Sequence, residues 1–173
     1  RSAGAMRAGV FSGEAHALSA DEQLTRVREQ PSMAGKNLSE QVTTPKRYDL
    51  AADTAVERVG TIVVLDLGVK RATVTYLSEH GFDVAVVPAS TTLEEIRAIT
   101  PDAIFYSNGP GDPAASDRQV ELLRELLRDG IPYFGICFGN QLLGRALGYD
   151  TYKLPFGHRG INQPVLDRAT GKV

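Results

Sequence analysis

Residues 131–147 read Ile-Pro-Tyr-Phe-Gly-Ile-Cys-Phe-Gly-Asn-Gln-Leu-Leu-Gly-Arg-Ala-Leu. An apolar run ends at a turn of small residues and then continues with helical spacing, which predicts a strand, a sharp turn and a helix. Cys137, the only cysteine of the chain, lies at this turn between Gly135 and Gly139. Glycines there allow the strand and the helix to approach closely, as in a nucleophile elbow. A lone cysteine is usually a small buried hydrophobe, but this position favours a catalytic nucleophile.

The residues before this stretch alternate between strand and helix patterns. Continuous β-branched and apolar runs predict strands buried on both faces of a sheet, at 61–67, 82–88, 102–106 and 131–136. Helical spacing follows each of these strands, at 70–80, 92–99, 116–128 and 138–148. Such an alternation predicts parallel strand-helix-strand units. We therefore expect an α/β fold with a mostly parallel sheet and helices on both faces, incomplete at the C-terminus. Residues 149–154 could add a fifth strand.

Local patterns indicate where helices begin and which side they bury. Three helices are expected to start with a Ser or Thr that is followed three residues later by Glu or Gln. These pairs are Ser19 with Glu22, Thr91 with Glu94 or Thr92 with Glu95, and Ser116 with Gln119. In the helix at 70–80, one face is predicted to carry Val69, Thr73, Tyr76 and Leu77.

The composition divides the chain into three parts. Residues 1–13 are short and glycine-rich, and we expect them to be the remnant of an N-terminal domain. Residues 14–58 hold one helix, ended by Pro31, and then a polar stretch with little periodicity, which predicts a helix-containing linker lying over the main domain. Residues 59–173 carry the alternating pattern and form the main domain, whose C-terminal part is expected to be missing.

Charge and hydropathy narrow the classes of partner. The chain has 173 residues, 42% hydrophobic and 23% charged, with 19 basic and 21 acidic side chains and a net charge of −2. These values are ordinary for a globular protein and suggest neither a nucleic acid nor a membrane as partner. A single cysteine excludes an internal disulfide and fits a reducing compartment. No apolar run approaches the ~20 residues of a membrane span, so we expect a cytoplasmic protein.

A second stretch, Ser107-Asn-Gly-Pro-Gly-Asp-Pro113, directly follows the strand predicted at 102–106. It could be only a rigid turn. Glycine on both sides of a proline instead suggests a loop whose fixed N–H groups stabilise a developing negative charge, as in an oxyanion hole. The N–H of Phe138, the residue after Cys137, would be a second donor. Because sites in parallel sheets lie beyond the carboxyl ends of the strands, we expect this loop beside Cys137.

The Cys137 segment and the 107–113 loop resemble those of class I glutamine amidotransferases. Two further stretches, Leu65-Asp-Leu-Gly-Val-Lys-Arg71 and Phe156-Gly-His-Arg-Gly-Ile-Asn-Gln-Pro164, are most similar to the small, glutamine-hydrolysing chain of carbamoyl-phosphate synthase. The resemblance covers about residues 59–173, which it identifies as a glutamine amidotransferase domain. It implies that Cys137 attacks the side-chain amide of glutamine, giving a γ-glutamyl thioester and ammonia, and that water then releases glutamate.

The resemblance also assigns roles to matching residues. It implies that the backbone N–H groups of Gly109 and Phe138 form the oxyanion hole, and that Gly109, Gly111, Phe138 and Gln141 bind glutamine. Ammonia would pass to a large synthetase subunit, which forms a heterodimer with this chain and uses ATP, Mg and bicarbonate. No cofactor or metal is expected on this chain itself. The product would feed arginine and pyrimidine biosynthesis.

One departure from the family pattern concerns the catalytic base. The family uses a His and a Glu two residues apart, whereas His158 is the only histidine after Cys137, and it matches a stretch that does not supply the base. We assign His158 a structural or substrate-side role and expect the chain as given to be inactive or severely impaired. Asn140 replaces a histidine found in many relatives. His16 and His80 lack metal-ligand spacing.

Two alternatives remain open at this point. The chain could be the glutaminase part of another amidotransferase, such as one serving anthranilate or GMP synthesis, since those share the Cys137 segment. It could also be a catalytically silent module that binds glutamine or docks a subunit, which the missing His and Glu would suit. The 156–164 stretch and the remnant at residues 1–13 favour carbamoyl phosphate over both.

Overall fold

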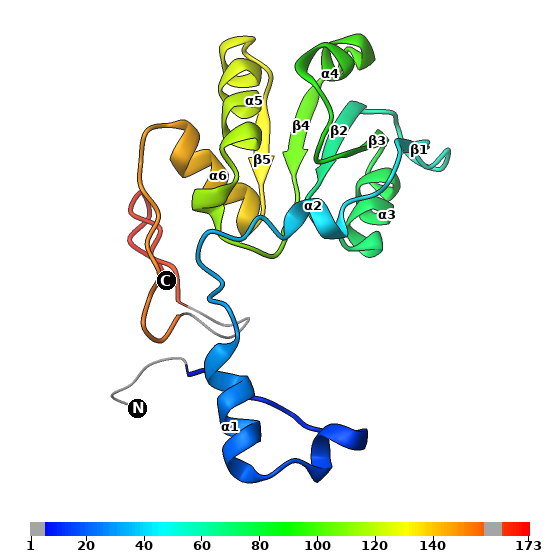
Figure 1. Ribbon diagram of the computed structural model, residues 1–173. Coiled ribbons are helices and arrows are strands. Elements are labelled where there is room, and N and C mark those ends of the chain that lie inside the picture. The colour runs from blue at the N-terminus through cyan, green and yellow to red at the C-terminus, as the bar shows by residue number, and fades with distance from the viewer. Residues whose placement is uncertain (1–5, 158–163) are drawn as a thin grey trace. The chain divides into compact units, whose positions relative to one another are not determined.

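The computed structural model describes residues 6–157 and 164–173, and Figure 1 shows its helices and strands. The described residues form two compact units, one of residues 32–151 and the other of residues 6–31, 152–157 and 164–173. The second unit contains the 3-10 helix η1 (Gly13–Ala17) and helix α1 (Ala20–Glu29). Ser19 and Glu22 form the predicted capping box at the start of α1. No helix within the described ranges is long and apolar enough to cross a membrane.

The unit of residues 32–151 is built on a five-stranded sheet with the order β1-β3-β2-β4-β5 (Figure 1). Its strands are β1 (Tyr48–Leu50), β2 (Gly60–Asp66), β3 (Phe82–Pro88), β4 (Ala103–Tyr106) and β5 (Tyr133–Gly135). Strands β2 to β5 run parallel to one another, and β1 pairs antiparallel with β3. At the centre, Val64 lies opposite Val86 of β3 and Phe105 of β4. The expected α/β fold with a mostly parallel sheet is therefore confirmed.

Helices cover both faces of this sheet. They are α2 (Ser39–Val42), α3 (Arg71–Glu79), α4 (Leu93–Ile99), η2 (Pro113–Ala115), α5 (Asp117–Arg128) and α6 (Phe138–Ala146). Alternate residues of β2 point to opposite sides. Leu65 joins a buried cluster with residues of α4, α5 and α6, whereas Val64 joins a second cluster with Val74 of α3. Each fully buried side chain of this kind stabilises the fold by roughly 1.5–3 kcal/mol.

Three local expectations were wrong. Residues 149–154 form no strand. In α3 the buried residues are Val74 and Ser78, while Tyr76 is exposed. Ser78 is buried because its hydroxyl donates to the carbonyl of Ala51 at 2.7 Å, a partner that the helical pattern does not reveal.

The start of α5 also differs from its predicted capping box. Ser116 is the N-cap residue but makes no side-chain capping hydrogen bond. Gln119 is fully buried, and its Nε2 donates to the carbonyl of Ala89 at 3.2 Å and to Glu40 at 3.3 Å. Its side chain therefore serves tertiary packing rather than the cap. At α4, by contrast, Thr92 and Glu95 form the expected box.

Strand β1 was not predicted, and its connection to β2 is held by Asp83 of β3. One carboxylate oxygen of Asp83 accepts from Ala52 N at 2.9 Å, and the other accepts from Arg58 Nε at 2.6 Å. These contacts, the backbone hydrogen bond first, lower the pKa of the Asp83 carboxyl below its usual value. The ionised side chain thus fastens residues 52–58 to the sheet.

We expect Asp83→Asn to destabilise the protein at neutral pH and to have little effect in acid. A depressed folded-state pKa contributes stability above the unfolded-state value of about 3.9, and that contribution is lost as the pH falls through the folded-state pKa. Urea unfolding of the wild type and the variant between pH 7 and pH 2 measures the difference in the free energy of unfolding. A difference that persists or grows in acid would contradict this account.

Candidate active site

The predicted strand, turn and helix around Cys137 are present. Strand β5 ends at Gly135, α6 begins at Phe138, and Cys137 is the N-cap residue with φ 54° and ψ −104°. Of the described non-glycine residues, only Thr100 shares a positive φ. This backbone conformation is strained for a side-chain-bearing residue, and such strain concentrates at functional sites. The thiol is exposed at the turn rather than packed in the core.

Two glycines make this sharp turn possible. A Cβ on Gly139 would lie 2.3 Å from the carbonyl oxygen of Tyr106, in the adjacent strand β4. A Cβ on Gly135 would lie 2.7 Å from the carbonyl carbon of Gly139. The first turn of α6 therefore rests directly on the backbone of β4, as the sequence predicted for glycines flanking the cysteine.

The 107–113 loop follows β4 and is fixed to the end of β2 by buried polar contacts. The hydroxyl oxygen of Ser107, which is fully buried, accepts from Leu67 N at 2.9 Å. Asn108 Nδ2 donates to the carbonyl of Gly68 at 3.0 Å. A Cβ on Gly109 would lie 2.1 Å from the carbonyl oxygen of Leu67, so only glycine fits there. The sequence analysis missed the roles of Ser107 and Asn108, although polar residues directly after a buried strand were a signal.

The other side of the loop contacts the chain that precedes the sheet. Gly111 has a φ of 115°, and a Cβ on it would lie 2.8 Å from the carbonyl oxygen of Lys36. Asp112 N donates to that same carbonyl at 2.9 Å, and Gly35 N donates to the Asp112 carboxylate at 2.8 Å. Residues 35–38 thus cover the loop, and the loop is held from two directions.

The loop and the turn meet at one edge of the sheet. Strands β4 and β5 are adjacent and parallel, and their carboxyl ends point the same way in Figure 1. Gly139 N donates to the carbonyl of Ser107 at 3.2 Å, which joins α6 to the start of the loop. The N–H of Phe138, at the first position of α6, has no intrahelical acceptor and lies at the positive end of the helix. The arrangement can stabilise a negative oxygen beside an exposed thiol.

The remaining predicted site residues are placed as follows. Gln141 is exposed on α6, one turn after Cys137, and its N–H donates to the Cys137 carbonyl at 3.0 Å. Asn140 is exposed on the same turn. His158 and most of the 156–164 stretch lie outside the described residues. His80 follows α3, and its Nδ1 is 2.8 Å from the Tyr76 carbonyl. Because α3 runs back from the carboxyl edge of the sheet, His80 lies at the opposite edge from Cys137.

No group of His, Cys, Asp or Glu in the described part of the chain could hold a metal ion. The site in view therefore consists of a thiol, backbone N–H groups and polar side chains. Such groups suit nucleophilic attack on a carbonyl with stabilisation of the resulting oxyanion.

Comparisons with known proteins agree with this chemistry. Residues 63–173 match the sequence profile of the family described as glutamine amidotransferase class-I. Carbamoyl phosphate synthase small chains from Streptomyces avermitilis and Mycobacterium tuberculosis strain H37Rv are 51% and 53% identical over 175 residues, which is 100% of this chain and 45% and 46% of theirs. The chain thus spans less than half the length of these relatives. A solved structure of a GMP synthase subunit from Thermoplasma acidophilum has a TM-score of 0.44 and 24% identity over 51% of this chain and 45% of that chain.

Proposed function

Because the chain belongs to the class-I glutamine amidotransferases, we propose that it is part of the glutamine-hydrolysing subunit of a carbamoyl-phosphate synthase. One observation carries this proposal. Cys137 occupies a strained, exposed turn that is hydrogen-bonded to the 107–113 loop. The chain is also 51% identical to a carbamoyl phosphate synthase small chain along its whole length. The anthranilate and GMP alternatives share the thiol and the loop, but they have no comparable support along the whole chain.

In the proposed reaction the Cys137 thiolate attacks the side-chain carbonyl carbon of glutamine. A carbon–sulfur bond forms, and the carbonyl oxygen becomes an oxyanion held by the N–H groups of Gly109 and Phe138. Collapse of this intermediate breaks the carbon–nitrogen bond and releases ammonia, leaving a γ-glutamyl thioester. Water then cleaves the thioester to glutamate and restores the thiol. Gly111 and Gln141 would hold the glutamine substrate.

Departure of the amide nitrogen requires a proton donor. Neither the Cys137 turn nor the 107–113 loop carries a histidine. We therefore expect the isolated chain to hydrolyse glutamine poorly and the intact protein to supply the His and Glu. Ammonia would pass to a large synthetase subunit, where ATP and Mg would be used, and no cofactor is proposed on this chain.

The test is a synthesis assay on the intact protein together with its large subunit. We expect glutamine and free ammonia both to support carbamoyl-phosphate formation, and we expect the large subunit by itself to use only ammonia. Glutamate release should accompany the glutamine-driven reaction. Formation of anthranilate or GMP instead would identify a different amidotransferase. Glutamine binding without glutamate release would identify a silent binding module.

A further inference from the structure

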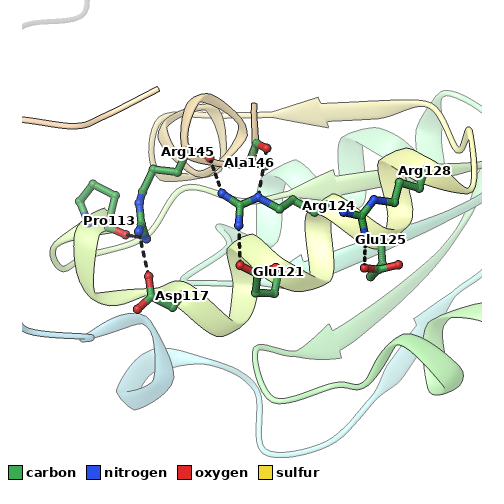
Figure 2. A network of polar contacts seen from close by, with 8 residues as sticks. All are labelled: Pro113, Asp117, Glu121, Arg124, Glu125, Arg128, Arg145 and Ala146. Carbon is green, nitrogen blue, oxygen red and sulfur yellow. Dashed lines mark hydrogen bonds and ion pairs between the residues drawn. The ribbon is translucent and has the colours of Figure 1, made fainter. Parts of the chain in front are cut away.

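Arg145, in the last turn of α6, reaches from the helix that follows Cys137 to the far end of the 107–113 loop. Its Nη1 donates to the carbonyl oxygen of Pro113 at 2.9 Å, and its Nη2 donates to the Asp117 carboxylate at 2.8 Å (Figure 2). The Arg145 side chain is 22% exposed, whereas that of Asp117 is 79% exposed. The bond to the Pro113 carbonyl is therefore the more shielded of the two contacts.

This contact means that α6 holds the loop at both of its ends. At the near end, Gly139 in the first turn of α6 donates its N–H to the carbonyl of Ser107 at 3.2 Å. At the far end, Arg145 in the last turn holds Pro113. Between these two attachments lies Gly109, whose N–H is one of the two proposed oxyanion donors. The other donor, Phe138, belongs to α6 itself, so the attachments set the position of one donor relative to the other.

We propose that Arg145 is a positioning residue of the glutaminase site, which keeps the 107–113 loop in register with α6. Its fixed, planar guanidinium donates to a carbonyl and a carboxylate at once, which the single ammonium of lysine does less well. This inference rests on the proposed function, because its consequence is the alignment of Gly109 and Phe138 on one oxyanion. Arg145 itself touches no reacting atom in this scheme.

A neighbouring arginine provides a matched control. Arg124 of α5 donates from Nε to the carbonyl of Ala146 at 3.2 Å and from Nη2 to the carbonyl of Arg145 at 3.1 Å, and it pairs with Glu121 (Figure 2). These bonds satisfy carbonyls at the end of α6, and those described do not reach the loop. Loss of Arg124 should therefore loosen the same helix end without releasing Pro113.

The experiment compares Arg145→Met with Arg124→Met in the intact protein with its large subunit. For Arg145→Met we expect kcat for glutamine hydrolysis to fall by about tenfold to a hundredfold, with the KM for glutamine little changed, because the oxyanion exists only beyond the ground state. The rate of Cys137 alkylation by iodoacetamide should stay at the wild-type value, since that displacement forms no oxyanion. Arg124→Met should keep a kcat close to wild type.

Arg145→Lys keeps the stem and one donor, and it carries the test if the methionine variant does not fold. Its kcat should lie between those of the wild type and Arg145→Met, with unchanged alkylation. A wild-type kcat in both Arg145 variants would overturn the inference. An equal fall in hydrolysis and alkylation would also overturn it, since the Cys137 turn itself would then depend on Arg145. Absence of glutamine hydrolysis in the wild type would instead overturn the proposed function.

Discussion

Replacing Cys137 with serine is expected to lower glutamine hydrolysis by the intact protein on the order of a thousandfold or more, because the covalent step loses its nucleophile. The serine hydroxyl occupies nearly the same space at the turn but is far less ionised and less nucleophilic than a thiol. Cys137 is exposed, so the substitution creates no cavity and the fold should persist. Glutamate release measures the hydrolysis directly.

The same variant separates the two halves of the proposed reaction. With the large subunit present, Cys137→Ser should abolish synthesis driven by glutamine and leave synthesis driven by free ammonia at the wild-type rate. The ammonia-driven rate is the control, because it shows that the subunits still assemble and that the large subunit is active. Glutamine-driven synthesis that survives the substitution would show that Cys137 is not the nucleophile.

The strands and helices of the main unit could be predicted because their patterns are local. Strand β2 is buried on both faces, so its sequence is a continuous apolar run that has no other ready explanation. Strand β1 gave no such signal, since all three of its residues are exposed and its pairing with β3 is purely tertiary. Buried Gln119 was misassigned for the same reason, because its partners lie on other elements.

The candidate site divides in the same way. The cysteine and its flanking glycines form a contiguous motif, and their spacing alone predicted the turn. Ser107 and Arg145 could not be assigned in advance, because their partners Leu67 and Pro113 lie 40 and 32 residues away along the chain. A local pattern therefore identified the groups proposed to react, while the groups that fix their positions emerged only from the folded chain.

Replacing Gly139 with alanine is expected to cost about 3 kcal/mol or more in the free energy of unfolding, at or above the upper end of ordinary overpacking. The new Cβ would lie 2.3 Å from the carbonyl oxygen of Tyr106. That oxygen belongs to the backbone of β4, which cannot rotate away as a side chain would. The first turn of α6 must therefore move, and the Phe138 N–H moves with it. Urea unfolding measures the loss of stability, and glutamate release measures the loss of activity.

Gly144 provides the matched control for Gly139, since it lies in the same helix and a Cβ on it would meet no atom within 4 Å. Gly144→Ala should stabilise the protein by roughly 0.5–1 kcal/mol, because alanine favours the helix interior over glycine. Opposite signs for the two substitutions would locate the requirement for glycine in the contact between α6 and β4 rather than in helix propensity. If Gly139→Ala were as stable and as active as Gly144→Ala, close approach of α6 to β4 would not be what holds the Cys137 turn.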